Sequence, residues 1–167
     1  NGGTGGNVAI QWSELRQLMA GTTSVAGSGG VAGLLRNLDK ADVSATGASQ
    51  MSLGANTLGA LYDTFPMRDT AGNELTEGCA YPSVPNASIV PGSAAYLPHI
   101  SEGIERSARN EFLCISGVLT GAAGVFTPRT AMIHGIALKP ADVRFVADKG
   151  SSLIWSCGLP MKNLLTW

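Results

Sequence analysis

Charged residues are scarce in this chain, and neither sign dominates. Only 14% of the 167 residues are charged, with 11 lysines and arginines against 12 aspartates and glutamates. This balance gives no electrostatic reason to expect nucleic acid or an anionic membrane surface as a partner. No stretch approaches the roughly 20 consecutive apolar residues that a membrane span needs. These absences exclude the classes of protein that bind through strong charge or long apolar runs.

Cysteine is also rare, with Cys79, Cys114 and Cys157 widely spaced and no CxxC pair. An odd number of cysteines at such spacings argues against a disulfide framework or a cysteine zinc site. We therefore expect free thiols in a reducing compartment, and a cytoplasmic protein. Residues 1–7 are rich in glycine and lack the charged and apolar regions of a signal peptide, so they are expected to be a loose lead-in.

The first part of the chain contains one clear helix and several ambiguous segments. Leu15, Leu18 and Met19 recur at helical spacing and predict a helix over residues 8–20, which Gly21 would cap. The period is less regular beyond this point, because glycines and small residues interrupt it. The segments expected next are a short strand at 22–26, a short helix at 34–38 and a strand within 51–65.

The second half alternates strands and helices more clearly. Pro140 falls in the first turn of one expected helix and Gly150 follows its end, as is typical of helix boundaries. Strands and helices that alternate with short connections predict βα units and a parallel sheet. The expected order is strand 94–100, helix 102–116, strand 130–136, helix 140–149 and strand 151–156.

The two histidines each stand at the C-terminal end of an expected strand. His99 ends one strand and His134 the next, and in parallel α/β folds these strand ends face the active site. A lone histidine is more often structural, but two in equivalent positions favour a shared site with zinc-ligating imidazoles. Glu102 can reach the same cavity, accept a proton from water and protonate a leaving group. An acid in the first turn of a helix is also favoured by the helix dipole alone.

Several segments, in the right order, resemble the amidohydrolase superfamily. Residues 98–104, Pro-His-Ile-Ser-Glu-Gly-Ile, are similar to its PH-x-[AS]-EG segment, and residues 127–138 to its TPRT…HG…L pattern. Residues 142–156 resemble the family's next helix and strand, and residues 18–25 its GTT-containing helix–strand pair. The most similar branch is that of the chlorohydrolases and the aminohydrolases of cyclic amidines, and the matches spread over residues 8–156.

The resemblance implies an α/β fold, a partial (β/α)8 TIM-like barrel with roughly strands two to seven. It also implies a hydrolase that depends on zinc or another divalent transition metal, in which metal-activated water attacks a C–N or C–Cl bond of a small cyclic substrate. His99 would match the metal-binding histidine after strand five, and Glu102 the glutamate that shuttles protons. His134 would match the histidine after strand six, which binds the metal or orients the water and substrate.

The sequence also departs from the family. The HxH pair after strand one and the aspartate after strand eight are not found, so part of the expected ligand set is missing. We expect residues 8–156 to be the barrel segment and residues 157–167 an atypical tail from a truncated or frame-altered reading. A barrel without its end strands would expose sheet edges, which favours homo-oligomers.

Two alternatives to an enzyme stay open. A non-catalytic fragment of such an enzyme would hold no metal, whereas a working site would bind one stoichiometrically. A dinucleotide-binding module is suggested by Gly27–Ala32, which has G-x-G-x-x-A spacing between a strand and a helix. The acidic residue that this fingerprint needs about 20 positions further on is not found, because Asp39 and Asp42 come too early. Arg109 and Arg129 are expected to be capping or solvated charges rather than substrate anchors.

Overall fold

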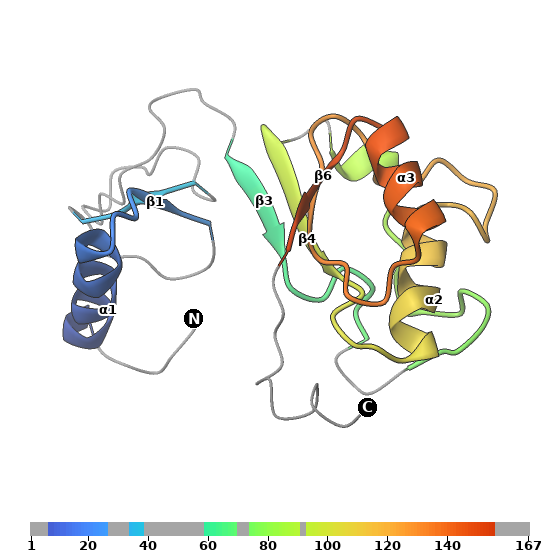
Figure 1. The fold of residues 1–167 in the computed structure, drawn as a ribbon, viewed down its shortest axis with the longest axis horizontal. Helices are drawn as coiled ribbons and strands as arrows, with labels where there is room; N and C mark the ends of the chain where they lie inside the picture. The colour runs from blue at the N-terminus through green and yellow to red at the C-terminus, as the bar shows by residue number, and fades with distance from the viewer. Residues whose placement is uncertain (1–6, 27–33, 39–58, 70–73, 91–92, 156–167) are drawn as a thin grey trace. The chain divides into compact units, whose positions relative to one another are not determined.

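A computed structural model gives the fold of the chain (Figure 1), whose contacts divide it into two units, residues 1–62 and 63–167. None of the helices in the described stretches combines the length and the apolar character that crossing a membrane requires. The structure describes residues 7–26, 34–38, 59–69, 74–90 and 93–155.

The first unit contains one helix and a pair of two-residue strands. Helix α1 spans Asn7–Met19, and Gly21 follows it with a φ of +91°, a left-handed conformation that glycine adopts without a steric penalty. Strand β1 (Ser24–Val25) pairs in parallel with strand β2 (Arg36–Asn37). The helix, its glycine cap and the first strand confirm the sequence predictions.

The short helix expected at residues 34–38 is wrong, because this segment contains β2. The N–H of Leu38 donates to the carbonyl of Val25 at 2.8 Å, which continues the pairing with β1. Leucines spaced over five residues fit one helical turn and a short buried strand equally well, so the parallel partner decides between them. The segment Gly27–Ala32, on which the dinucleotide alternative depends, lies outside the described residues.

In the second unit, strands β4, β5 and β6 form a parallel sheet in that order. Strand β3 spans Ala60–Asp63, at the end of the range in which the sequence predicts a strand. Strands β4 (Ala95–Ile100), β5 (Ala131–His134) and β6 (Ser152–Ile154) then pair in parallel, each with the next. The mixed α/β class and the parallel pairing predicted for the second half are therefore confirmed.

Two helices connect these parallel strands and lie on the same side of the sheet (Figure 1). Helix α2 (Arg106–Ile115) follows β4, and helix α3 (Pro140–Asp148) follows β5. Phe112 of α2 is fully buried, with its ring centroid 5.4 Å from that of Phe126 and 6.0 Å from that of Phe145 in α3. This aromatic cluster joins the two helices through their side chains.

Helix α2 begins later than the sequence predicts. A helix over residues 102–116 would place Ile104 on the same apolar face as Phe112 and Ile115, but the side chain of Ile104 is 70% exposed. The helix starts at Arg106, because Ser101 adopts a left-handed conformation with a φ of +61° and a turn follows it. Phe112 and Ile115 are buried, as their spacing predicts.

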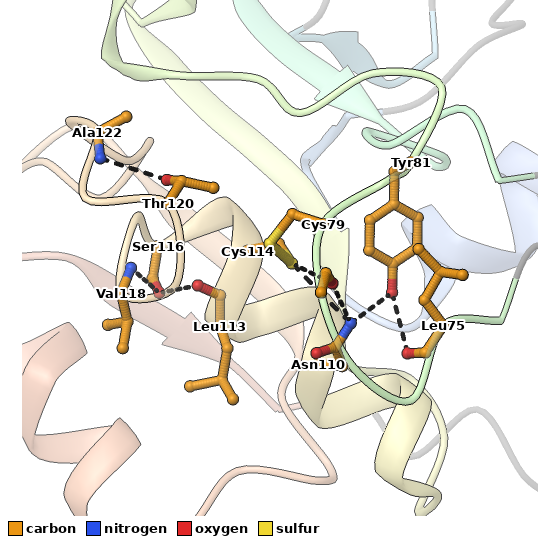
Figure 2. The surroundings of a disulfide bond; sticks show 11 residues. Leu75, Cys79, Tyr81, Asn110, Leu113, Cys114, Ser116, Val118, Thr120 and Ala122 are labelled. Carbon is orange, nitrogen blue, oxygen red and sulfur yellow. Dashed lines mark hydrogen bonds between the residues drawn. A yellow bond between two sulfur atoms is a disulfide. The ribbon is translucent and has the colours of Figure 1, made fainter.

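Cys79 and Cys114 form a disulfide bond (Figure 2), with their Cα atoms 5.6 Å apart. The prediction of free thiols is therefore wrong for these two residues, while Cys157 lies outside the described part of the chain. Their 35-residue separation gives no local signal, and only the fold brings the loop before β4 against α2. Disulfides persist mainly in oxidising compartments, which weighs against the reducing compartment expected from the cysteine spacing.

Hydrogen bonds tie the same loop to α2 beside the disulfide (Figure 2). The side-chain amide of Asn110 donates to the carbonyl of Gly78 at 2.8 Å and to the hydroxyl of Tyr81 at 3.3 Å. The Tyr81 hydroxyl in turn donates to the carbonyl of Leu75 at 3.4 Å. The loop is thus fixed to α2 by both covalent and polar contacts.

Candidate metal centre

Both histidines stand where the sequence predicts, at the C-terminal ends of neighbouring parallel strands. His99 is the next-to-last residue of β4, and His134 is the last residue of β5. The strand register pairs His99 with Ile133 and His134 with Ile100, so the alternation of side chains alone would not bring the two rings together. His134 leaves the strand conformation with a φ of +80°, and its ring meets that of His99.

The three residues predicted to form the site lie next to one another. His134 Nε2 is 3.1 Å from His99 Nδ1 and 3.7 Å from Glu102 Oε2. The two rings meet edge to face, with centroids 4.8 Å apart and planes at 75°. One ligand atom from each of the three residues lies within 4.8 Å of the others, so a single ion could contact all three.

The three side chains differ in their access to solvent. His134 is buried at 5% exposure and His99 is half-buried, whereas the side chain of Glu102 is 59% exposed. Burial, and then the neighbouring His134, lower the pKa of His99, against the opposing effect of Glu102. The His99 ring is therefore neutral near pH 7, which is the form of imidazole that binds metals.

The donor set fits a divalent transition metal. Two imidazole nitrogens and a carboxylate oxygen are ligands that zinc accepts at catalytic sites. Two nitrogens at about 2.0–2.1 Å from a tetrahedral zinc ion are about 3.4 Å apart. The ring nitrogens of His99 and His134 are 3.1 Å apart, a hydrogen-bond distance that is close to this spacing, and the exposed Glu102 carboxylate lies beside the pair, 3.7 Å from His134 Nε2.

The backbone of the site is held in an uncommon conformation at two positions. Ser101 has a φ of +61° and His134 a φ of +80°, and neither is a glycine. A left-handed conformation costs about 1–2 kcal/mol for a residue with a side chain. Such residues concentrate at functional sites, where the surrounding structure maintains them. Both positions lie at strand ends that carry the proposed ligands, so the strain marks the same site as the side chains.

A cavity of about 270 Å³ opens beside His99 and Glu102. Its lining is rich in acidic side chains and includes one aromatic hydroxyl. A small cavity next to converging polar groups is typical of a small-molecule site. Besides His99 and Glu102, its polar lining includes Asp69, Glu74, Tyr81, Glu105 and Glu111.

Sequence reasoning missed Glu111, which is the carboxyl of this cavity with the most perturbed pKa. Burial raises the pKa of Glu111 to about 8; its hydrogen bond with Asp69 also raises it, while the hydrogen bond from the Ser101 N–H lowers it. In the sequence Glu111 is an ordinary acid within a helix. The sequence of the helix offers no signal that separates it from a solvated acid.

Arg109 is not available as a substrate anchor. Its Nε donates to Asp142 Oδ2 at 2.8 Å and its Nη2 to Asp142 Oδ1 at 3.0 Å, which ties α2 to the first turn of α3. Arg129 contacts the carbonyl of Ser93 through Nη1 at 3.5 Å. Both arginines make structural contacts, and the bidentate ion pair of Arg109 is neither the capping nor the solvated charge that the sequence suggests.

No protein-family model matches this chain, and neither a curated protein nor a solved structure gives a significant match. The resemblance to the amidohydrolases therefore stays a prediction from the segments quoted above. The cluster of His99, Glu102 and His134 is independent of that resemblance, because it follows from the geometry of two strand ends.

Proposed function

We propose that this chain carries a divalent-metal centre of the hydrolytic kind. His99 and His134 are its ligands, and Glu102 is the group that moves protons. The observation that carries the proposal is the convergence of these three side chains within 4.8 Å, from the ends of two neighbouring parallel strands. Exposed acids gather by chance, but an imidazole pair with nitrogens 3.1 Å apart and one ring buried is a much more specific arrangement.

Each residue has a position that suits its proposed role. A divalent ion bound here would supply Lewis-acid activation of water or of a substrate oxygen. His134 is buried at a strand end, so its ring is held in place as a ligand should be. Glu102 is exposed to the cavity, so it can take a proton from water and return it to a leaving group.

The cavity, the amidohydrolase resemblance and the order of the elements support a reaction class and a fold. The cavity of about 270 Å³ suits a small substrate, and hydrolysis of a C–N or C–Cl bond in a small cyclic molecule is the class that the amidohydrolase resemblance supports. The succession β4-α2-β5-α3-β6 is the repeating unit of a (β/α)8 barrel, whose active sites lie at the C-terminal ends of the strands. We infer that these strands are part of such a barrel.

Zinc binding by the purified chain tests the proposal. After equilibrium dialysis against Zn²⁺, we expect one zinc per wild-type chain and loss of this stoichiometric zinc in His99→Ala and His134→Ala. Glu102→Gln should keep its zinc, because the proposed role of Glu102 is proton transfer. Glu105→Gln is the matched control, since Glu105 lines the same cavity but is not part of the cluster. A folded wild-type chain that takes up no zinc would contradict the proposal and favour a non-catalytic chain.

A further inference from the structure

Two hydrogen bonds made by Ser101 hold the turn between β4 and α2 against the helix. The N–H of Ser101 donates to Glu111 Oε2 at 2.7 Å, and its hydroxyl donates to the carbonyl of Ala108 at 2.8 Å. Ser101 is fully buried, so its N–H needs a protein partner to replace water. Ser101 stands between His99 and Glu102 in the chain. The hydrogen bonds that hold Ser101 therefore constrain the backbone from which those two side chains extend.

The other side of the same turn is fixed by main-chain contacts with the segment after β5. The N–H of Gly135 donates to the carbonyl of Ile100 at 3.0 Å, and the N–H of Ile136 donates to that of Ser101 at 2.8 Å. These backbone bonds are insensitive to most substitutions. Of the contacts that hold the turn, the hydrogen bond to the Glu111 carboxyl is thus the one that a substitution in another element can remove.

Glu111 is itself held in place by its surroundings. Its half-buried side chain lines the cavity, where burial and a hydrogen bond with Asp69 raise its pKa. When it is protonated, the Glu111 carboxyl can donate a hydrogen bond to Asp69 and still accept one from the Ser101 N–H. A glutamine at position 111 could make both bonds, with its amide N–H as donor and its carbonyl as acceptor.

We propose that Glu111 is a positioning residue of the metal centre. It fixes Ser101 and, through Ser101, the geometry in which His99 and Glu102 face His134. Its effect on metal affinity rests on the proposed function, whereas its effect on the turn holds in the metal-free chain. Groups that orient metal ligands through hydrogen bonds typically change metal affinity by about 10–100-fold when they are removed.

The test uses the full 167-residue chain with Zn²⁺ alone as the probe, in competition with a chelator of known affinity. We expect Glu111→Leu to weaken zinc binding about 10–100-fold and Glu111→Gln to stay close to wild type. Ile115→Val, a buried change one helical turn beyond Glu111, is the control for general loosening of α2 and should leave the affinity unchanged.

The same variants are compared without metal by NMR. In Glu111→Leu we expect faster hydrogen exchange of the Ser101 amide and shifted ring signals of His99 and His134. Glu111→Gln should show the wild-type exchange rate of the Ser101 amide and the wild-type histidine signals. A role of position 111 that depends only on filling space would not predict this difference between Leu and Gln. If Glu111→Leu does not fold, Glu111→Asp takes its place, because its shorter side chain cannot reach the Ser101 N–H in the same geometry.

The outcomes separate this inference from the proposed function. A folded Glu111→Leu or Glu111→Asp chain with wild-type zinc affinity and unchanged histidine signals would overturn the positioning role. If the wild-type chain binds no zinc, the proposed function fails, and the Ser101 exchange and histidine signals of the metal-free variants still decide whether Glu111 positions the turn.

Discussion

The two turns that follow the histidine-bearing strands are built in different ways. The first turn, residues 101–105 between β4 and α2, is held by hydrogen bonds to a half-buried carboxyl and to the helix backbone. The second turn, residues 135–139 between β5 and α3, depends on a glycine in close apolar packing. A Cβ added to Gly135 would lie 2.8 Å from Leu153 Cδ1 and 3.2 Å from Leu138 Cδ1.

This difference matches what each turn presents to the site. The first turn carries Glu102, which is exposed and is proposed to exchange protons. The second follows His134, which is buried and is proposed to hold a metal in a fixed position. A polar turn responds to pH and to contacts with its helix, whereas an apolar turn responds to volume. The following variants test whether the two turns differ in this way.

Removal of the disulfide should lower the free energy of unfolding most. The disulfide joins the loop before β4 to α2, the helix that the first turn precedes. The double variant Cys79→Ser, Cys114→Ser is expected to lower the free energy of unfolding by about 2–5 kcal/mol, because the cross-link restricts the unfolded chain. Urea denaturation with and without a reductant measures it. The wild type should be sensitive to the reductant and the double variant should not. Free thiols at both positions in the unreduced wild type would contradict the structure.

Gly135→Ala should break the second turn. Its φ of +68° costs a residue with a side chain about 1–2 kcal/mol, and the new methyl group would crowd Leu153, so we expect a total loss of about 2–4 kcal/mol in denaturation. Gly121→Ala is the matched control, since Gly121 has a φ of +69° but open space around its Cα. Equal losses in the two variants would show that apolar packing does not hold the second turn.

The two turns should also differ in the pH dependence of stability, with opposite signs and by less per pH unit than either substitution above costs. Burial raises the pKa of Glu111 to about 8, so its contribution to stability is present below its unfolded pKa of about 4.3 and is lost as the pH rises toward 8. Burial favours a higher pKa for Asp142, but hydrogen bonds from Arg109 and the Lys139 N–H lower it overall. Its contribution is therefore present above about pH 3.9 and is lost as the pH falls through the lowered pKa.

Unfolding free energies of the wild type and two variants over pH 3–9 measure these contributions. His99, whose pKa is lowered, titrates with the opposite sign to Glu111, so the difference between wild type and variant is the relevant quantity. We expect Glu111→Gln to remove a decline of less than about 1.4 kcal/mol per pH unit between about pH 4.5 and 8. Asp142→Asn should reduce the loss below about pH 4. A Glu111→Gln profile parallel to that of the wild type would contradict the polar account of the first turn.

The elements of the second half could be predicted because their signals are local. Pro140 at the start of α3 and Gly150 after its end mark a helix whatever surrounds it. The two histidines and Glu102 could be predicted as one site because parallel strands place their C-terminal ends at the same edge of the sheet. This rule needs only the order of the elements along the chain.

What could not be predicted depends on contacts between distant residues. Cys79 and Cys114 meet across a separation of 35 residues, and their spacing points to no pairing. Glu111 gains its role from Ser101 and Asp69, which lie in other elements, and nothing in the helix sequence distinguishes it from a solvated acid. The left-handed backbone of His134, which turns its ring toward His99, is likewise a product of the folded chain.

The central claim is that His99 and His134 bind the same metal ion. X-ray absorption at the zinc edge of the zinc-loaded chain tests this most directly, because it reports the number of imidazole ligands. We predict two imidazoles with oxygen in the remaining positions for the wild type, and loss of the stoichiometric zinc in His99→Ala. A wild-type spectrum without imidazole, or one with sulfur ligands, would contradict the account.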